Sequence, residues 1–112
     1  MEFSINNSMW KVCLKDAKTL KDTLNKENES DYTYVFGLTK YSLHEIWINE
    51  EMCKEQKIKT FKHELTHCYI WNYGLASVPN FNEEMVCDLV SSINDFIDTT
   101  VKKFKMEVLN ES

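Results

Sequence analysis

The chain has 112 residues, enough for one domain with its own core, so we expect a single domain over residues 1–112. The formal net charge of −5 disfavours a nucleic-acid partner, because a surface that binds phosphates needs a basic stripe. The first residues resemble no secretion signal, and no apolar run reaches the length that crosses a membrane. We therefore expect a cytoplasmic protein with reduced cysteines and no membrane partner.

The first half of the chain predicts one helix and three strands. Apolar and polar residues alternate over residues 10–14, which indicates a strand with one buried face. Asp16 is placed to cap a helix that ends in the polar stretch 25–31. Residues 32–38 are rich in aromatic and β-branched side chains, and residues 45–49 alternate, so both segments are predicted strands. The short polar link between them suits a hairpin.

The second half predicts two helices. Apolar residues at helical spacing indicate a helix that reaches about Asn72, with Gly74 placed to end it. Asn80 and Glu83 are spaced as a capping box for a last helix, whose apolar period continues as far as Phe104. The expected fold class is α+β. A small three-stranded sheet would pack on these two helices, with one further helix near the N-terminus.

The most informative motif is His63-Glu64-Leu65-Thr66-His67, inside the first of these two helices. Residues four apart lie on one face of a helix, so His63 and His67 can offer ring nitrogens to one zinc ion. Glu64 is rotated by one residue from His63, where its carboxylate can accept a proton from water at the metal. The motif therefore predicts a catalytic Zn²⁺ site with Glu64 as the general base.

A catalytic zinc ion takes a third protein ligand and keeps one position open. Glu84 and Asp88 are four apart on the last predicted helix and share a face. Glu84 can supply the third ligand, while Asp88 can accept the outer N–H of a ligand histidine. Glu83 points about 100° away from Glu84 around the same helix and stays the alternative ligand.

Five residues match the pattern of the gluzincins, metallopeptidases with two His and one Glu on zinc: His63, Glu64, His67, Glu84 and Asp88. The thermolysin branch carries Asn-Glu-x-x-x-Asp on the helix after the active-site helix, and this chain has Glu83 in place of that Asn. The short spacing and length are similar to the minigluzincins and to compact phage-type peptidases related to the ImmA/IrrE family. The resemblance implies a minimal zincin-like domain in which Asp88 would bond His63.

Motif and resemblance together predict a zinc-dependent endopeptidase that acts on a peptide or protein. We expect the substrate to lie extended along the exposed edge of strand 45–49. The hydrogen-bond donor for the oxyanion is open among four candidates, Tyr41, His44, Tyr69 and Tyr73. The alternative is a catalytically silent zinc-binding domain that regulates or binds another protein. Such a domain needs no general base, so Glu64 favours the enzyme.

Overall fold

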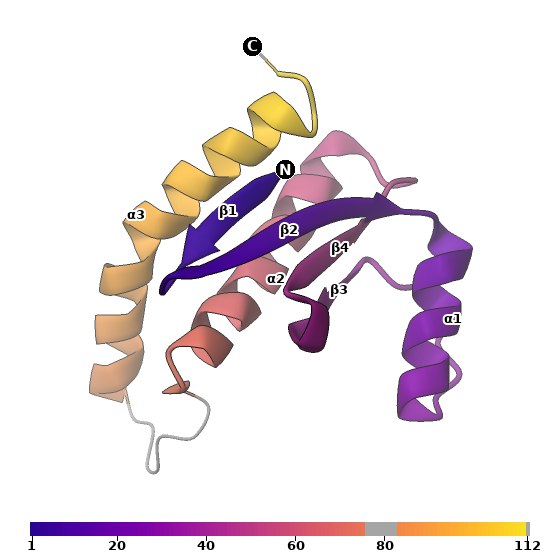
Figure 1. Cartoon of the computed structure of the whole chain (residues 1–112), viewed down its shortest axis with the longest axis horizontal. Coiled ribbons are helices and arrows are strands. Elements are labelled where there is room, and N and C mark those ends of the chain that lie inside the picture. The colour runs from indigo at the N-terminus through magenta and orange to yellow at the C-terminus, as the bar shows by residue number, and fades with distance from the viewer. Residues whose placement is uncertain (76–82, 112) are drawn as a thin grey trace.

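The computed structural model describes residues 1–75 and 83–111. The fold is α+β, as predicted, and Figure 1 shows its helices around a twisted sheet. Along this part of the chain the elements are β1 (Glu2–Ile5), β2 (Ser8–Lys15), α1 (Ala17–Asn28), β3 (Gly37–Lys40), the 3₁₀ turn η1 (Tyr41–Leu43), β4 (Glu45–Asn49), α2 (Lys54–Asn72) and α3 (Glu83–Glu107).

The sheet is mixed, with strand order β1-β2-β4-β3. The outer strands β1 and β3 pair antiparallel with β2 and β4, and the two inner strands run parallel to each other. The parallel pair requires a crossover, which α1 and β3 provide. Strand 45–49 and its hairpin with the preceding strand are confirmed. The prediction that strand 45–49 forms the free edge is wrong, because β4 is paired on both sides and β3 forms the edge.

The predicted count of three strands is also wrong, because β1 adds a fourth. Phe3 and Ile5 are buried and alternate with exposed residues, which is the same pattern that identified β2. Asn6 and Asn7 join β1 to β2 with φ of 47° and 63°. A two-residue hairpin turn of type I′ needs positive φ at both central positions, and Asn adopts this conformation more readily than most residues. The signal for β1 was therefore present in the sequence.

Residues 32–36 do not form the predicted strand, and only the end of the predicted segment, from Gly37, belongs to β3. The backbone of this segment instead makes hydrogen bonds outside the sheet pairing. One example is the bond that Asn49 Nδ2 donates to Val35 O at 3.0 Å. Helix α1 also runs to Asn28, further into the polar stretch than predicted, and ends at Glu29 in a left-handed conformation (φ 51°).

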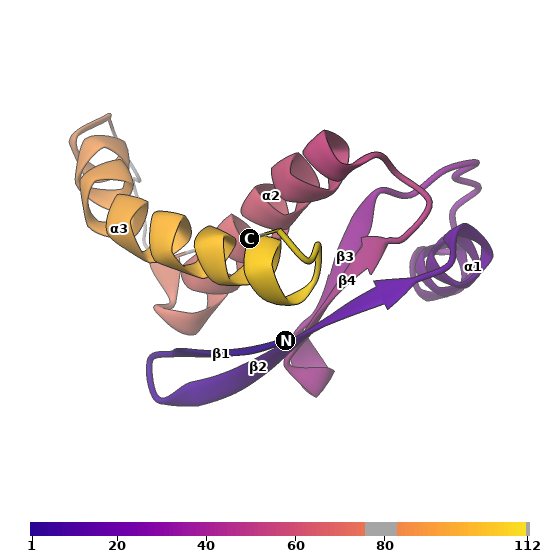
Figure 2. The same cartoon turned by 90° about the horizontal axis from the view of Figure 1, so that it is seen from above.

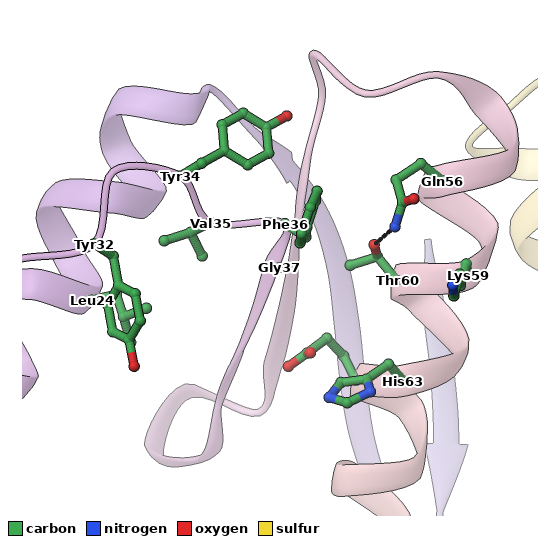
Figure 3. A pocket seen from close by; sticks show the side chains of 11 residues that line it. Leu24, Tyr32, Tyr34, Val35, Phe36, Gly37, Gln56, Lys59, Thr60 and His63 are labelled. Carbon is green, nitrogen blue, oxygen red and sulfur yellow. Dashed lines mark hydrogen bonds between the residues drawn. The ribbon is translucent and has the colours of Figure 1, made fainter.

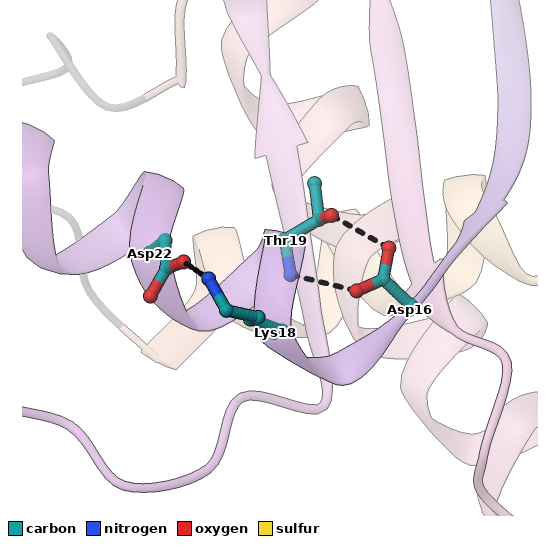
Figure 4. Close-up of polar contacts among 4 residues, drawn as sticks. All are labelled: Asp16, Lys18, Thr19 and Asp22. Atoms are coloured by element: carbon teal, nitrogen blue, oxygen red, sulfur yellow. Dashed lines mark hydrogen bonds and ion pairs between the residues drawn. The ribbon is translucent and has the colours of Figure 1, made fainter.

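Asp16 caps α1 as predicted (Figure 4). Its carboxylate accepts hydrogen bonds from Thr19 N at 3.1 Å and Thr19 Oγ1 at 2.6 Å. An ion pair between Lys18 and Asp22, 2.8 Å and one turn apart, lies on the exposed side of the same helix. The N-terminus of α1, where the crossover begins, is thus determined by local sequence.

The main core lies between the sheet and two helices, and Figure 2 shows α2 and α3 together on one side of the sheet. Ile46 and Ile48 of β4 meet Phe61 of α2 in one fully buried cluster. The ring of Phe61 stacks on Phe104 of α3, with centroids 4.4 Å apart. Each such side chain contributes roughly 1.5–3 kcal/mol by leaving water. This packing determines which face of α2 turns outward.

Helix α2 ends at Asn72 as predicted, and Gly74 follows with φ 65°, a conformation that suits glycine. Helix α3 is confirmed from Glu83 onward, whereas Asn80 of the predicted capping box lies outside the described residues. No helix among residues 1–75 and 83–111 is long and apolar enough to cross a membrane.

Candidate metal centre

The two histidines of the motif extend from the exposed side of α2, opposite Phe61 and Leu65. The Nε2 atoms of His63 and His67 are 3.1 Å apart, and the two rings meet edge to face. Two ligands about 2.0–2.1 Å from one ion, at a tetrahedral angle, lie roughly 3.3 Å from each other. The spacing of these nitrogens therefore fits two ligands of a single zinc ion.

Glu64 follows His63 on α2, but its side chain turns toward β3 and is 9% exposed. Thr39 of β3 donates a hydrogen bond from Oγ1 to Glu64 Oε1 at 3.0 Å. The other carboxylate oxygen, Oε2, accepts no hydrogen bond within the described part of the chain. One neutral hydroxyl thus orients the carboxylate and leaves an oxygen available. The motif did not indicate Thr39, because a single threonine 25 residues away in sequence carries no local signal.

Helix α2 and strand β3 approach closely at Gly37. A Cβ atom on Gly37 would lie 2.6 Å from Thr60 Cγ2 and 3.3 Å from Glu64 Cγ. The absence of a side chain at this position lets β3 lie against the helix. Thr39, two residues further along the strand, is thereby brought within hydrogen-bond distance of Glu64.

Tyr41, one of the four candidate oxyanion donors, lies within range of the charge of Glu64, the predicted general base. Its side chain is half-buried at the end of β3, and burial raises the pKa of its hydroxyl. The negative charge of Glu64 raises this pKa further. Its hydroxyl is protonated at neutral pH, like that of any tyrosine with an ordinary pKa near 10, and can donate a hydrogen bond.

The other three candidates have different surroundings. His44 stacks on Trp10 with ring centroids 4.7 Å apart and planes within 2°. Tyr69 and Tyr73 pack on each other with centroids 4.6 Å apart. Both line a pocket of about 380 Å³ between α2 and α3, called the second pocket below, which also includes Asp88. Tyr41 also has a ring contact, with Trp71 at 5.3 Å between centroids, so the feature that marks it is the nearby charge of Glu64.

The described residues do not locate the third ligand of the predicted zinc site. Glu84 belongs to α3, but its side chain and that of Glu83 lie outside the part of the structure that is described. Among the side chains that are described, no three His, Cys, Asp or Glu lie together as a metal site. Asp88 is exposed in the second pocket and makes no hydrogen bond to His63 there. The structure thus brings His63, Glu64 and His67 together, but not Asp88 with His63.

A pocket of about 740 Å³ opens beside the motif (Figure 3). It lies between α2 on one side and the segment of residues 32–37 with α1 on the other. The aromatic residues of this pocket were not predicted as site residues from the sequence. Their signal was the aromatic side chain at every second position, 32, 34 and 36. The lining residues are Leu24, Tyr32, Tyr34, Val35, Phe36, Gly37, Gln56, Lys59, Thr60, His63 and Glu64.

Comparisons with protein-family models, curated proteins and solved structures found no match for this chain. The resemblance to the gluzincins therefore rests on the motif residues alone. What the protein does has to be argued from the chemistry of the site.

Proposed function

We propose that this protein is a zinc-dependent peptidase in which His63, His67 and Glu84 hold the metal. The observation that carries the proposal is the 3.1 Å approach of the two histidine Nε2 atoms beside the oriented carboxylate of Glu64. A bound zinc ion supplies a Lewis acid for the scissile carbonyl and lowers the pKa of water toward ~7. A site that only stabilises the fold has no use for the carboxylate.

Glu64 is the proposed general base. It takes a proton from the water whose oxygen attacks the carbonyl carbon, and passes that proton to the nitrogen as the C–N bond breaks. Thr39 suits this role because its hydroxyl orients Oε1 and leaves the other carboxylate oxygen to accept the proton. Tyr41 is the proposed donor to the oxyanion, since its half-buried hydroxyl lies within range of the charge of Glu64.

The substrate is proposed to lie extended along β3. This strand ends the sheet order, so the outer edge of Gly37–Lys40 is unpaired in the described part of the chain. Main-chain hydrogen bonds to a free edge bind a peptide without regard to most of its side chains. An edge strand lying beside the motif helix is the arrangement expected of a minimal zincin-like domain, and we include that architecture in the proposal.

The test compares two carboxylates of α2. Glu64→Gln should retain zinc but lose peptide cleavage by at least about 10²-fold, because the base is removed while the ligands remain. Glu55→Gln is the matched control, since Glu55 is an exposed acidic residue in the first turn of the same helix. Cleavage is measured with quenched fluorescent peptides on zinc-loaded protein. Wild-type rates for Glu64→Gln would refute the general-base role.

Metal analysis after dialysis tests the ligands separately. Glu84→Ala should lower the zinc content, and full occupancy would assign the third ligand elsewhere. Asp88→Asn should be milder, costing about 10–100-fold in affinity or activity if Asp88 orients a ligand. Zinc-loaded wild-type protein that cleaves no peptide would leave the silent zinc-binding domain as the function.

A further inference from the structure

The pocket beside the motif has a wall of aromatic rings that are exposed to solvent. Tyr32, Tyr34 and Phe36 are 54%, 47% and 52% exposed. The rings of Tyr34 and Phe36 meet edge to face with centroids 5.1 Å apart. Single exposed apolar residues are ordinary on a protein surface, but contiguous ones lining a cavity mark binding sites.

The wall is held in place by two asparagines. Asn25 of α1 binds both backbone groups of Tyr32, accepting from its N at 2.8 Å and donating to its O at 2.9 Å. Asn49, which is fully buried, donates from Nδ2 to Val35 O at 3.0 Å and from its backbone N to Phe36 O at 2.9 Å. The exposed rings therefore project from an ordered backbone, so a ligand meets a preformed surface.

The opposite wall is the N-terminal half of α2 (Figure 3). Gln56 Nε2 donates to Thr60 Oγ1 at 3.2 Å, and Thr60 Oγ1 in turn donates to Met52 Sδ at 3.9 Å. Lys59 is exposed and pairs with no acidic group in the described part of the chain. Apart from the motif residues, its ammonium is the charge on this pocket. The carboxylate of Glu64 in the same lining offsets this charge, so the aromatic wall, which favours an apolar group, decides what the pocket binds.

We propose that this pocket binds an aromatic or large aliphatic side chain of the substrate, next to the scissile bond, and that Tyr34 and Phe36 determine this specificity. The inference rests on the proposed function, because the bound side chain is defined by the bond that is cleaved. His63 and Glu64 line the same pocket, so a side chain inside it lies beside the base. Gly37 links the aromatic wall to the edge strand, and a peptide on that edge passes the pocket mouth there.

The activity test uses peptides that differ at one position flanking the cleaved bond, carrying Phe, Leu, Ala or Lys. Wild-type protein should cleave the Phe and Leu peptides with kcat/KM about 10-fold or more above the Ala and Lys peptides. Phe36→Ala should lower kcat/KM for the Phe peptide about 10-fold more than it lowers kcat/KM for the Ala peptide. Met106→Ala, which truncates an apolar side chain 64% exposed on α3, is the matched control.

A binding test separates this inference from the proposed function. Fluorescence anisotropy is measured for labelled Phe and Ala peptides on Glu64→Gln protein, where no turnover is expected. Tighter binding of the Phe peptide, abolished by Phe36→Ala, would support the pocket even if no peptide is ever cleaved. Equal binding and cleavage of the Phe and Ala peptides would overturn the pocket while leaving the peptidase intact. Preference for the Lys peptide would overturn it as well.

Discussion

Substitution of Gly37 by alanine should disrupt the contact between β3 and α2 that orients Glu64, the proposed general base. The added Cβ would lie 2.6 Å from Thr60 Cγ2 and 3.1 Å from the backbone oxygen of Trp47. Trp47 O belongs to the paired strand β4, and Thr60 is buried, so neither neighbour can yield freely. Overpacking of this kind costs about 1–3 kcal/mol. We expect Gly37→Ala to lower the free energy of unfolding by that amount and to reduce cleavage, because Thr39 shifts from Glu64.

The assay is urea unfolding followed by tryptophan fluorescence, in a double-mutant cycle with Thr60→Ser. Serine removes the Cγ2 atom that clashes and keeps the hydroxyl that accepts from Gln56. The double variant should therefore recover part of the loss, with a coupling of roughly 0.5–3 kcal/mol. Gly74→Ala is the control, because a Cβ there meets nothing within 4 Å and the cost comes from its φ of 65°. Thr60→Ser should not rescue that variant.

Two results would refute this reasoning. Gly37→Ala could unfold at the wild-type urea concentration, which would mean that β3 and α2 adjust without cost. Alternatively, its loss could be the same with Thr60 or serine at position 60, which would place the conflict elsewhere than at Cγ2. Either outcome removes the close approach as the reason for glycine at this position.

Two further predictions concern the thiols and the helix cap. Burial raises the pKa of the fully buried Cys68 thiol to about 12. Iodoacetamide should therefore label the exposed Cys53 and Cys87 in native protein well before Cys68, which mass spectrometry would detect. Equal labelling of the three thiols would contradict the packing of α2. Hydrogen bonds from Thr19 lower the pKa of Asp16 in the folded protein below its ordinary 3.8. The stability that the charged Asp16 contributes is therefore fully present above pH 3.8 and is lost as the pH falls through the lowered pKa of the folded state. Asp16→Ala should therefore lower the thermal midpoint at pH 7 more than at pH 3, whereas an equal loss at both would show that the charge of Asp16 is irrelevant.

The local chemistry of the sequence determined the helices and the pairing of the motif histidines. A period of 3.6 residues brings positions 63 and 67 to one face wherever the helix packs, so their convergence follows from spacing alone. The cap at Asp16 and the end of α2 before Gly74 likewise depend on neighbours in sequence. The edge hairpin at Asn6 and Asn7 belongs to the same class, although its strand was not predicted.

Tertiary structure alone decided which strand is free and what surrounds Glu64. Strand order depends on pairing between distant segments, and the parallel pairing of β2 with β4 buries the strand that the sequence placed at the edge. The bond from Thr39 to Glu64 and the wall held by Asn49 join residues far apart in the chain. Alternation or helical period reports the faces of one element, but it carries no information about which element lies opposite. For that reason the sequence predicted that His63 and His67 lie together on α2, while the pocket beside them emerged only from the fold.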